Sequence, residues 1–216
     1  MAELLVIRHA QASFGEADYD KLSDLGHRQS EMVGQVLRDA GWKPDRLVAG
    51  TLKRQHETLS SMGFSESPET HSGLNEYDFH DLLNVRFDGH VPHDVIKDRK
   101  THFRTLRETI LDWQKGGLTG AAESWRDFSG RVENARSFAT ETDARRVLVI
   151  SSGGPIGQLV AQSLDAPASQ MIALNLQVKN TSMTRFFFSK RAFFLNEFNV
   201  TPHFSSQDRA NLLTYS

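Results

Sequence analysis

The stretch Leu4-Leu5-Val6-Ile7-Arg8-His9 consists of four apolar residues followed by two basic ones. An unbroken apolar run of this length is typical of a strand that is buried on both faces of a sheet. Residues 46–50 and 146–150 contain two similar runs. Each of the three runs is followed by apolar residues at helical spacing. The pattern therefore predicts repeated strand–helix units around a mostly parallel sheet.

Capping residues mark the boundaries of the first predicted helix. Ser23 precedes a run of apolar residues at helical spacing, and Gly41 follows it. A serine suits the start of a helix because its hydroxyl accepts from a free backbone N–H, and a glycine suits the turn after the end. The remaining elements are expected to be helices at 52–62, at 101–115, around 128–138 and from 153 onward, and a hairpin of 184–188 with 192–198.

The middle of the chain, about 79–122, is polar and rich in His and Asp. Its predicted helix ends at Gly116-Gly117, and no buried strand is expected in it. This composition indicates a small inserted cap. The chain of 216 residues, 1–216, is therefore predicted to be a single α/β domain, a three-layer sandwich whose mostly parallel central sheet is flanked by helices.

Composition excludes several classes of protein. The net charge is −2 with both signs scattered, so no nucleic-acid partner is expected. No apolar run approaches the roughly 18 residues that a membrane span needs, so no membrane partner is expected either. The N-terminus meets an Arg and a His too early for a signal peptide, and the chain has no Cys. A cytoplasmic location is the expectation.

Polar side chains gather where the three predicted strands end. The first strand ends in Arg8-His9-Ala10-Gln11, the second in Gly50-Thr51-Leu52-Lys53-Arg54 and the third in Ser151-Ser152-Gly153-Gly154. Ligands bind outside the carboxyl ends of the strands in open α/β sheets. If the three strands are neighbours, their ends form one pocket with two arginines, a histidine and the free amides of a helix start. That combination suits a dianionic phosphoryl group.

The same residues resemble a known family. Arg8-His9-Ala10 resembles the Arg-His-Gly signature of the histidine phosphatase superfamily, which includes the cofactor-dependent phosphoglycerate mutases. Four further stretches resemble segments of that superfamily in the same order, namely 22–29, 52–58, 74–76 and 149–156. The resemblance spans most of the chain and implies a phosphoglycerate mutase-like fold.

The resemblance implies a phosphatase that acts through a phosphohistidine on His9. Arg8 and Arg54 would disfavour the imidazolium, keep His9 neutral for attack on phosphorus, and stabilise charge in the transition state. Glu76 would donate a proton to the leaving oxygen and then activate the hydrolytic water. No metal and no cofactor is implied, and the partner is a small phosphorylated substrate. The expected phosphate ligands are Arg8, Arg54, Gln11, Ser152 and Gly153.

Two departures from the family pattern bear on activity. Ala10 stands where the family has glycine, which is a mild change if the backbone φ is negative. Ser152 stands where the family has its second histidine, so a neutral donor replaces one that can carry charge. His56 and His80 are the candidates for compensating this loss.

Alternative readings accompany several of these residues. Asp78 competes with Glu76 for the role of the acid, and Ser152-Gly153 also fits a simple strand–helix turn. The cluster His90-Val91-Pro92-His93-Asp94 is a weak candidate for a metal site and a better one for a solvated cap surface. The phenylalanines of 186–188 and 193–194 fit core strands, with the interface of a homodimer as the alternative.

Three functions are therefore open. The leading hypothesis is a metal-independent phosphomonoesterase. A second is a catalytically weakened phosphate-binding or regulatory protein on the same scaffold, because a fold alone does not establish an activity. A third is a phosphomutase, which the short chain disfavours.

Overall fold

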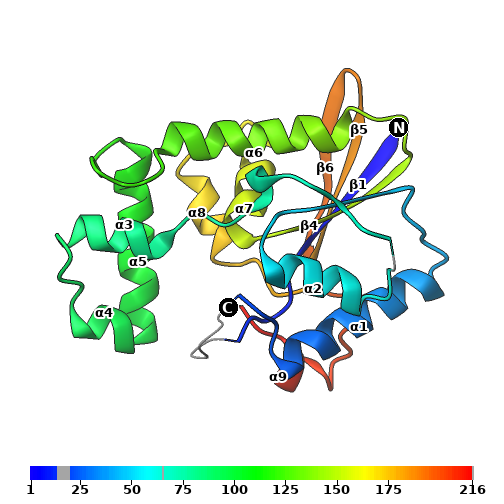
Figure 1. The fold of residues 1–216 in the computed structure, drawn as a ribbon, viewed down its shortest axis with the longest axis horizontal. Helices are drawn as coiled ribbons and strands as arrows, with labels where there is room; N and C mark the ends of the chain where they lie inside the picture. The colour runs from blue at the N-terminus through cyan, green and yellow to red at the C-terminus, as the bar shows by residue number, and fades with distance from the viewer. Residues whose placement is uncertain (14–19, 65, 216) are drawn as a thin grey trace.

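A six-stranded mixed sheet forms the centre of the protein, whose computed structural model describes residues 1–13, 20–64 and 66–215. The strands lie in the order β3-β2-β4-β1-β5-β6 (Figure 1). The first four strands in this order pair in parallel. β5 pairs antiparallel with β1 on one side and with β6 on the other. The strands are β1 (Ala2–Arg8), β2 (Arg46–Ala49), β3 (Glu69–Thr70), β4 (Arg146–Ser151), β5 (Met183–Ser189) and β6 (Ala192–Val200).

Helices cover both faces of the sheet. Side chains alternate along β1, so that Leu5 and Ile7 pack against α1 (Asp24–Asp39) and α2 (Lys53–Ser61). Leu4 and Val6 enter the opposite core with α6 (Trp125–Thr140) and α7 (Gly153–Ser163). Because both faces are buried, the strand has no polar face, and this explains its continuous apolar run. The predicted α/β sandwich with a mostly parallel sheet is confirmed.

The first helix begins and ends where its capping residues predict. The Ser23 hydroxyl accepts from the Gly26 N–H at 3.0 Å at the start of α1. Gly41 has a φ of +61°, a conformation that suits a residue without a side chain. These local interactions explain why the sequence alone placed this helix correctly.

Three helices make up the inserted region, α3 (Phe79–Arg86), α4 (His93–Lys97) and α5 (Arg99–Gln114). They stand together at one end of the molecule, away from the strands (Figure 1). The predicted helix of 101–115 is α5, which begins earlier because Asp98 accepts from the Thr101 N–H at 2.8 Å. The short α3 and α4 were not predicted, because one or two turns carry little periodicity.

Short elements escaped prediction elsewhere for the same reason. They are β3, the 3₁₀ helix η1 (Ser72–Leu74), α8 (Gln170–Asn175) and α9 (Arg209–Leu212). Of these, β3 and η1 lead from the sheet into the segment that carries Glu76, so they position this candidate site residue.

The phenylalanine-rich hairpin is largely core. Phe186 and Phe188 are buried, and Phe193 stacks on Phe186 with ring centroids 4.6 Å apart. Phe194 is 53% exposed on β6, which is the last strand of the sheet. The homodimer interface considered for these residues stays a prediction.

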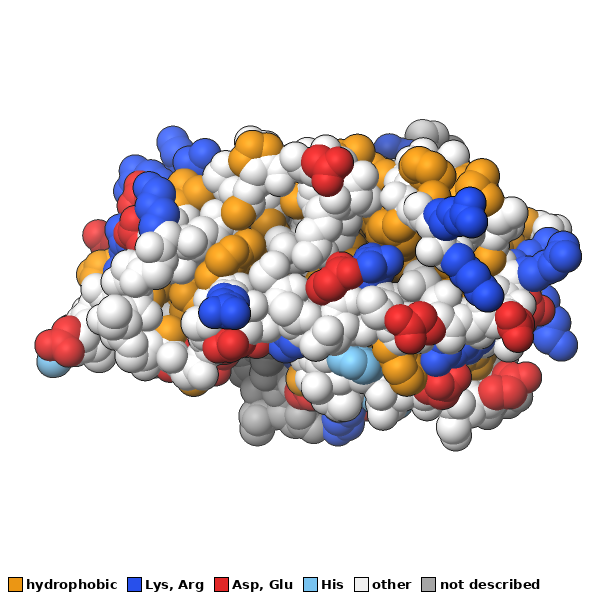
Figure 2. Space-filling model, turned by 90° about the horizontal axis from the view of Figure 1, so that it is seen from above, with side chains coloured by type: hydrophobic (Ala, Val, Ile, Leu, Met, Phe, Trp, Pro, Cys, Tyr) orange, Lys and Arg blue, Asp and Glu red, His pale blue; other side chains and the backbone are white. Residues whose placement is uncertain are grey.

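Charge on the surface is mixed. Acidic and basic side chains both occur across the face shown in Figure 2, among apolar and neutral groups. None of the helices in the described residues has the length and apolar content that crossing a membrane requires.

Candidate active site

The three predicted strand ends meet at one edge of the sheet. The His9 N–H donates to the Ser151 carbonyl at 2.8 Å, which places the end of β1 beside the end of β4. The Gly50 N–H donates to the Ile150 carbonyl at 3.2 Å, which places the end of β2 on the other side of β4. This convergence follows directly from the strand order.

His9 is buried and held by both ring nitrogens. Its Nδ1 lies 2.8 Å from the Ala10 carbonyl oxygen, so Nδ1 carries the hydrogen. The Nε of Arg54 donates to His9 Nε2 at 3.1 Å, so Nε2 presents its lone pair. Burial lowers the pKa of His9 well below its ordinary value, and the positive charges of Arg54 and Arg8 lower it further. The site therefore favours a neutral imidazole whose Nε2 lone pair faces Arg54.

The backbone around His9 is fixed by polar side chains. The Ala10 N–H donates to the Thr58 hydroxyl at 2.9 Å, and Asn180 donates to the His9 carbonyl at 3.1 Å. Ala10 is not among the described residues with positive φ. An alanine therefore fits here without backbone strain, as the mild reading of this departure expected.

Arg54 is buried on the first turn of α2 and bridges two groups. Besides His9, its Nη1 pairs with a carboxylate oxygen of Asp20 at 2.7 Å. The second oxygen of Asp20 accepts from the Lys53 N–H at 2.8 Å, near the start of the same helix. Asp20 was missed in the sequence, where it is one of several acids with no motif that pairs it with Arg54.

Glu76 lies against the N-terminus of α7. Both of its carboxylate oxygens lie 3.1 Å from the Gly154 nitrogen, whose N–H they share. Burial raises the pKa of Glu76, although the Gly154 N–H and the charges of Arg8 and Arg54 oppose the shift. Because the same two arginines act on both His9 and Glu76, the four side chains share one electrostatic environment.

The glycines at the start of α7 allow Glu76 to come close. A Cβ on Gly154 would lie 2.2 Å from Glu76 Oε1, and a Cβ on Gly153 would lie 2.4 Å from Asn175 Oδ1. Asn175 also donates to the Tyr77 hydroxyl at 2.8 Å. Burial raises the pKa of Tyr77 well above its ordinary value, with a further contribution from Glu76. Tyr77 and Asn175 were missed because no spacing in the sequence connects them.

Arg8 and Gln11 make specific contacts with protein groups. Arg8 donates through Nη1 to the Val178 carbonyl and, at 2.9 Å, to the Tyr215 carbonyl. Gln11 Oε1 accepts from the Ser23 hydroxyl at 2.8 Å, beside the start of α1. Arg8 thus lies within electrostatic reach of His9, whereas the Gln11 side chain is turned toward α1.

Ser152 is fully buried at the start of α7. Its Oγ accepts from Gln55 Nε2 at 3.1 Å, and Gln55 also donates to the Leu74 carbonyl at 2.9 Å. The Ser152 hydroxyl therefore takes part in a hydrogen-bonded network that connects β4, α2 and the segment before Glu76.

The structure also places the residues of the alternative readings, namely Asp78, His80 and His56. Asp78 is exposed and accepts from the His80 and Asp81 N–H groups at 3.0 Å each, as the N-cap of α3. The ring of His80 packs on Phe79 with centroids 4.0 Å apart, and His56 is half-buried on α2. No set of three or more His and carboxylate side chains placed to hold a metal ion occurs within 1–13, 20–64 and 66–215.

A family model decides the relationship of the chain to known proteins. The model of the histidine phosphatase superfamily (branch 1) matches residues 4–201. The chain belongs to this superfamily. The resemblance that Arg8-His9-Ala10 and the four later stretches indicated is thereby confirmed.

Solved structures of several phosphatases have the same fold. A phosphoserine phosphatase mutant from Entamoeba histolytica, in complex with phosphoserine, has a TM-score of 0.67 at 17% identity, over 94% of this chain and 99% of that one. A mycobacterial glucosyl-3-phosphoglycerate phosphatase with inorganic phosphate has a TM-score of 0.68 at 24% identity, over 95% and 100%. A putative α-ribazole-5′-P phosphatase from Escherichia coli has a TM-score of 0.67 at 20% identity, over 92% and 96%.

One curated sequence is related over a shorter stretch. An uncharacterized chloroplastic protein from Arabidopsis thaliana is 34% identical over 73 residues. The match covers 30% of this chain and 34% of that protein, so it spans about a third of the curated relative.

Proposed function

We propose that this histidine phosphatase hydrolyses small phosphate monoesters through a phosphohistidine on His9. The observation that carries the proposal is the state of His9, whose Nδ1 lies against the Ala10 carbonyl while Nε2 accepts from Arg54. A neutral imidazole with a defined lone pair is what attack on phosphorus requires.

The reaction proceeds in two displacements. Nε2 of His9 attacks phosphorus, the bond to the ester oxygen breaks, and protonated Glu76 gives its proton to the leaving oxygen. Water then attacks the phosphohistidine and gives a proton to the Glu76 carboxylate, and the nitrogen–phosphorus bond breaks to release phosphate. The raised pKa of Glu76 favours the protonated form that the first step needs.

Arg54 and Arg8 are the proposed charged ligands of the phosphoryl group. The Nε–H that Arg54 now gives to Nε2 of His9 would turn to a phosphoryl oxygen as the substrate enters. Gly153 and Ser152 are proposed to complete the set, and Gln11 would join it by turning from Ser23 at the start of α1. Arginine forks suit charge that spreads over three equatorial oxygens.

A weakened enzyme or a phosphate-binding protein is the second candidate. The observation that favours it is the environment of Ser152, a neutral side chain that is fully buried against Gln55 and brings no charge to the phosphoryl group. The two candidates differ in turnover and not in affinity for phosphate.

Trapping the phosphoenzyme separates these candidates. Wild type and His9→Ala are mixed with radiolabelled phosphate monoesters, including phosphoserine, and quenched in base, in which phosphohistidine survives. We expect label on the wild type alone, turnover of at least one ester, and no loss of turnover when a chelator is present. Phosphate binding without label or turnover would favour the binding protein, and equal turnover by His9→Ala would reject His9 as the nucleophile.

A further inference from the structure

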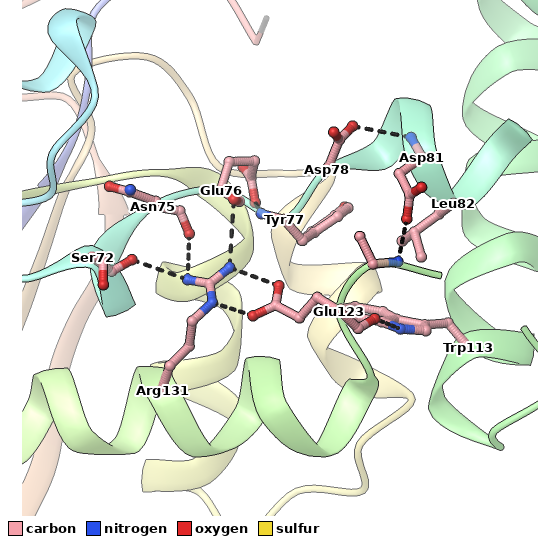
Figure 3. A pocket seen from close by; sticks show the side chains of 11 residues that line it. Ser72, Asn75, Glu76, Tyr77, Asp78, Asp81, Leu82, Trp113, Glu123 and Arg131 are labelled. Carbon is pink, nitrogen blue, oxygen red and sulfur yellow. Dashed lines mark hydrogen bonds and ion pairs between the residues drawn. The ribbon is translucent and has the colours of Figure 1, made fainter. Parts of the chain in front are cut away.

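Arg131 lies beneath the segment that carries Glu76. Arg131 is on α6, and its guanidinium donates to the carbonyls of Ser72, Gly73 and Asn75 at 3.3, 3.1 and 2.7 Å, and to that of Glu76 at 3.4 Å. Figure 3 shows this guanidinium between the 72–76 segment and Glu123. One side chain thus donates hydrogen bonds to four of the carbonyls of five consecutive residues.

Glu123 holds the guanidinium in this orientation. Its carboxylate accepts from Arg131 Nε at 2.5 Å and from Nη2 at 3.0 Å. The Glu123 carbonyl in turn accepts from the Trp113 indole at 2.8 Å. Trp113 is on α5, so the pair also ties the cap to the segment before Glu76.

The segment lies directly on the backbone of α6. A Cβ on Gly73 would be 2.1 Å from the Arg131 carbonyl oxygen, so only glycine permits this approach. Contact at Gly73 fixes one end of the segment, and the Gly154 N–H holds the carboxylate of Glu76 at the other end. Residues 72–76 lie outside the sheet, so their carbonyls need other donors. Arg131 donates to four of the five, and Gln55 donates to that of Leu74.

A cavity lies on the same side of the segment as Arg131. It has a volume of about 300 Å³ and is bordered by Tyr77, Leu82 and Trp113. Because the segment faces open space there, packing cannot hold it in place from that direction. On that side the hydrogen bonds from Arg131 hold the segment, while Gln55 and Ser151 hold the Leu74 carbonyl from the other.

We propose that Arg131, oriented by Glu123, is a positioning residue for Glu76. The proposal rests on the proposed role of Glu76 as general acid. Loss of the guanidinium would release the four carbonyls and let the segment shift. A displacement of about 1 Å at a catalytic group lowers the rate by roughly a hundredfold in unfavourable cases.

Leaving groups of different basicity test this role. An alkyl phosphate needs a proton on its leaving oxygen, whereas the leaving group of p-nitrophenyl phosphate needs little help. The variant Arg131→Gln should lower kcat/KM about tenfold or more for the alkyl phosphate that wild type hydrolyses fastest, and less than about threefold for p-nitrophenyl phosphate. A variant that only destabilises the fold lowers both equally.

Arg136→Gln is the matched control. Arg136 is also on α6 and makes a two-pronged ion pair with Glu133, and its side chain is 25% exposed, against 22% for Arg131. We expect this variant to keep both activities. Arg131→Lys should be intermediate, because one ammonium replaces a fork of donors.

The variant Glu76→Gln shows whether a negative result concerns the positioning role of Arg131 or the proposed role of Glu76 as acid. If Glu76→Gln loses both activities equally, Glu76 is not the acid and the proposed function fails at that point. If Glu76→Gln is selective and Arg131→Gln is not, the positioning role is overturned. In Glu76→Gln with Arg131→Gln we expect no further loss on the alkyl phosphate. Should Arg131→Gln unfold, Glu123→Gln must show the same selectivity, and equal loss on both substrates would reject the proposal.

Discussion

Arg54 donates its Nε hydrogen to Nε2 of His9 across 3.1 Å, which joins the candidate nucleophile to the charge next to it. The bond forms only with a neutral imidazole, since an imidazolium has no lone pair to accept it. The same guanidinium pairs with Asp20, so one arginine connects the nucleophile to a carboxylate at the edge of the site. The predictions below follow from these contacts and from the burial of the groups involved.

Removal of the Arg54 guanidinium should weaken phosphate binding. We expect Arg54→Ala to lower the affinity for inorganic phosphate or vanadate by about 1.5–3 kcal/mol, the scale of a charge-assisted hydrogen bond. The pKa of His9 should also rise, because one of the charges that lower it is lost. Calorimetry and the NMR titration of His9 measure the two effects, and an unchanged affinity would place Arg54 outside the phosphate site.

Neutralising Asp20 should have the opposite effect on phosphate. Its carboxylate is partly exposed and occupies Nη1 of Arg54. In Asp20→Asn, phosphate no longer competes with the charge of Asp20, so we expect tighter binding by about 1 kcal/mol or less. The same calorimetric titration measures it. Weaker binding in Asp20→Asn would mean that Asp20 serves mainly to orient Arg54.

The pH dependence of kcat/KM should report His9 and Glu76. The proposed mechanism needs His9 neutral and Glu76 protonated. Burial lowers the pKa of His9 from its ordinary value of 6.5 and raises that of Glu76 from 4.5. Both shifts enlarge the population of the active form.

We therefore expect the acid limb to lie well below pH 6.5 and the alkaline limb above pH 4.5. Glu76→Gln should lower the rate and remove the alkaline limb that Glu76 causes. The ionisation of the phosphate ester, near pH 6, is the same for both proteins and cancels in their ratio. A ratio that does not change with pH would contradict the assignment of Glu76.

Two substitutions of Ser152 should show separately what its hydroxyl contributes to the rate and how much room its position has. Ser152→Ala removes a neutral hydrogen bond, so we expect kcat to fall by less than about tenfold. Ser152→His introduces the histidine that the resemblance implies at this position, but the position is fully buried and in contact with Gln55. Overpacking should then lower the free energy of unfolding by about 1–3 kcal/mol.

Steady-state kinetics and denaturant unfolding of both Ser152 variants check this. A rise in kcat for Ser152→His without loss of stability would show that the site has room for an imidazole and that the missing charge limits the rate.

His203 should make the protein less stable in acid. It is buried, and burial lowers its pKa to about 4. Between pH 6.5 and 4 the unfolded chain binds a proton at this position that the folded protein does not, so the free energy of unfolding falls as the pH falls.

For His203 alone, the loss from pH 6.5 to pH 5 should be about 1.6 kcal/mol. His203→Gln keeps a polar group for the Thr181 hydroxyl, which lies 3.0 Å from His203 Nε2, and should remove this part of the slope. His9 contributes in the same direction and leaves a residual slope. Urea unfolding at both pH values measures it, and equal slopes in the two proteins would contradict the prediction.

The sequence determined the elements whose signals are local. The run Leu4–Ile7 specifies a buried strand, Ser23 caps a helix through its own hydroxyl, and Gly41 ends that helix in a conformation that glycine favours. The order of motifs after Arg8-His9 was sufficient to indicate the family. These features depend on neighbouring residues or on periodicity, both of which can be read along the chain.

Only the tertiary structure decided which residues form hydrogen bonds and ion pairs with the side chains of the site. Asp20 pairs with Arg54 across 34 positions, and Gly154 supplies the N–H that holds Glu76 from 78 positions away. Arg131 reaches the carbonyls of 72–76 from another layer of the fold. Such contacts depend on the crossing of strands and helices in space, and a side chain carries no mark in the sequence of which distant backbone it will meet. Burial, which sets the pKa values of His9 and Glu76, is likewise a property of the packed structure.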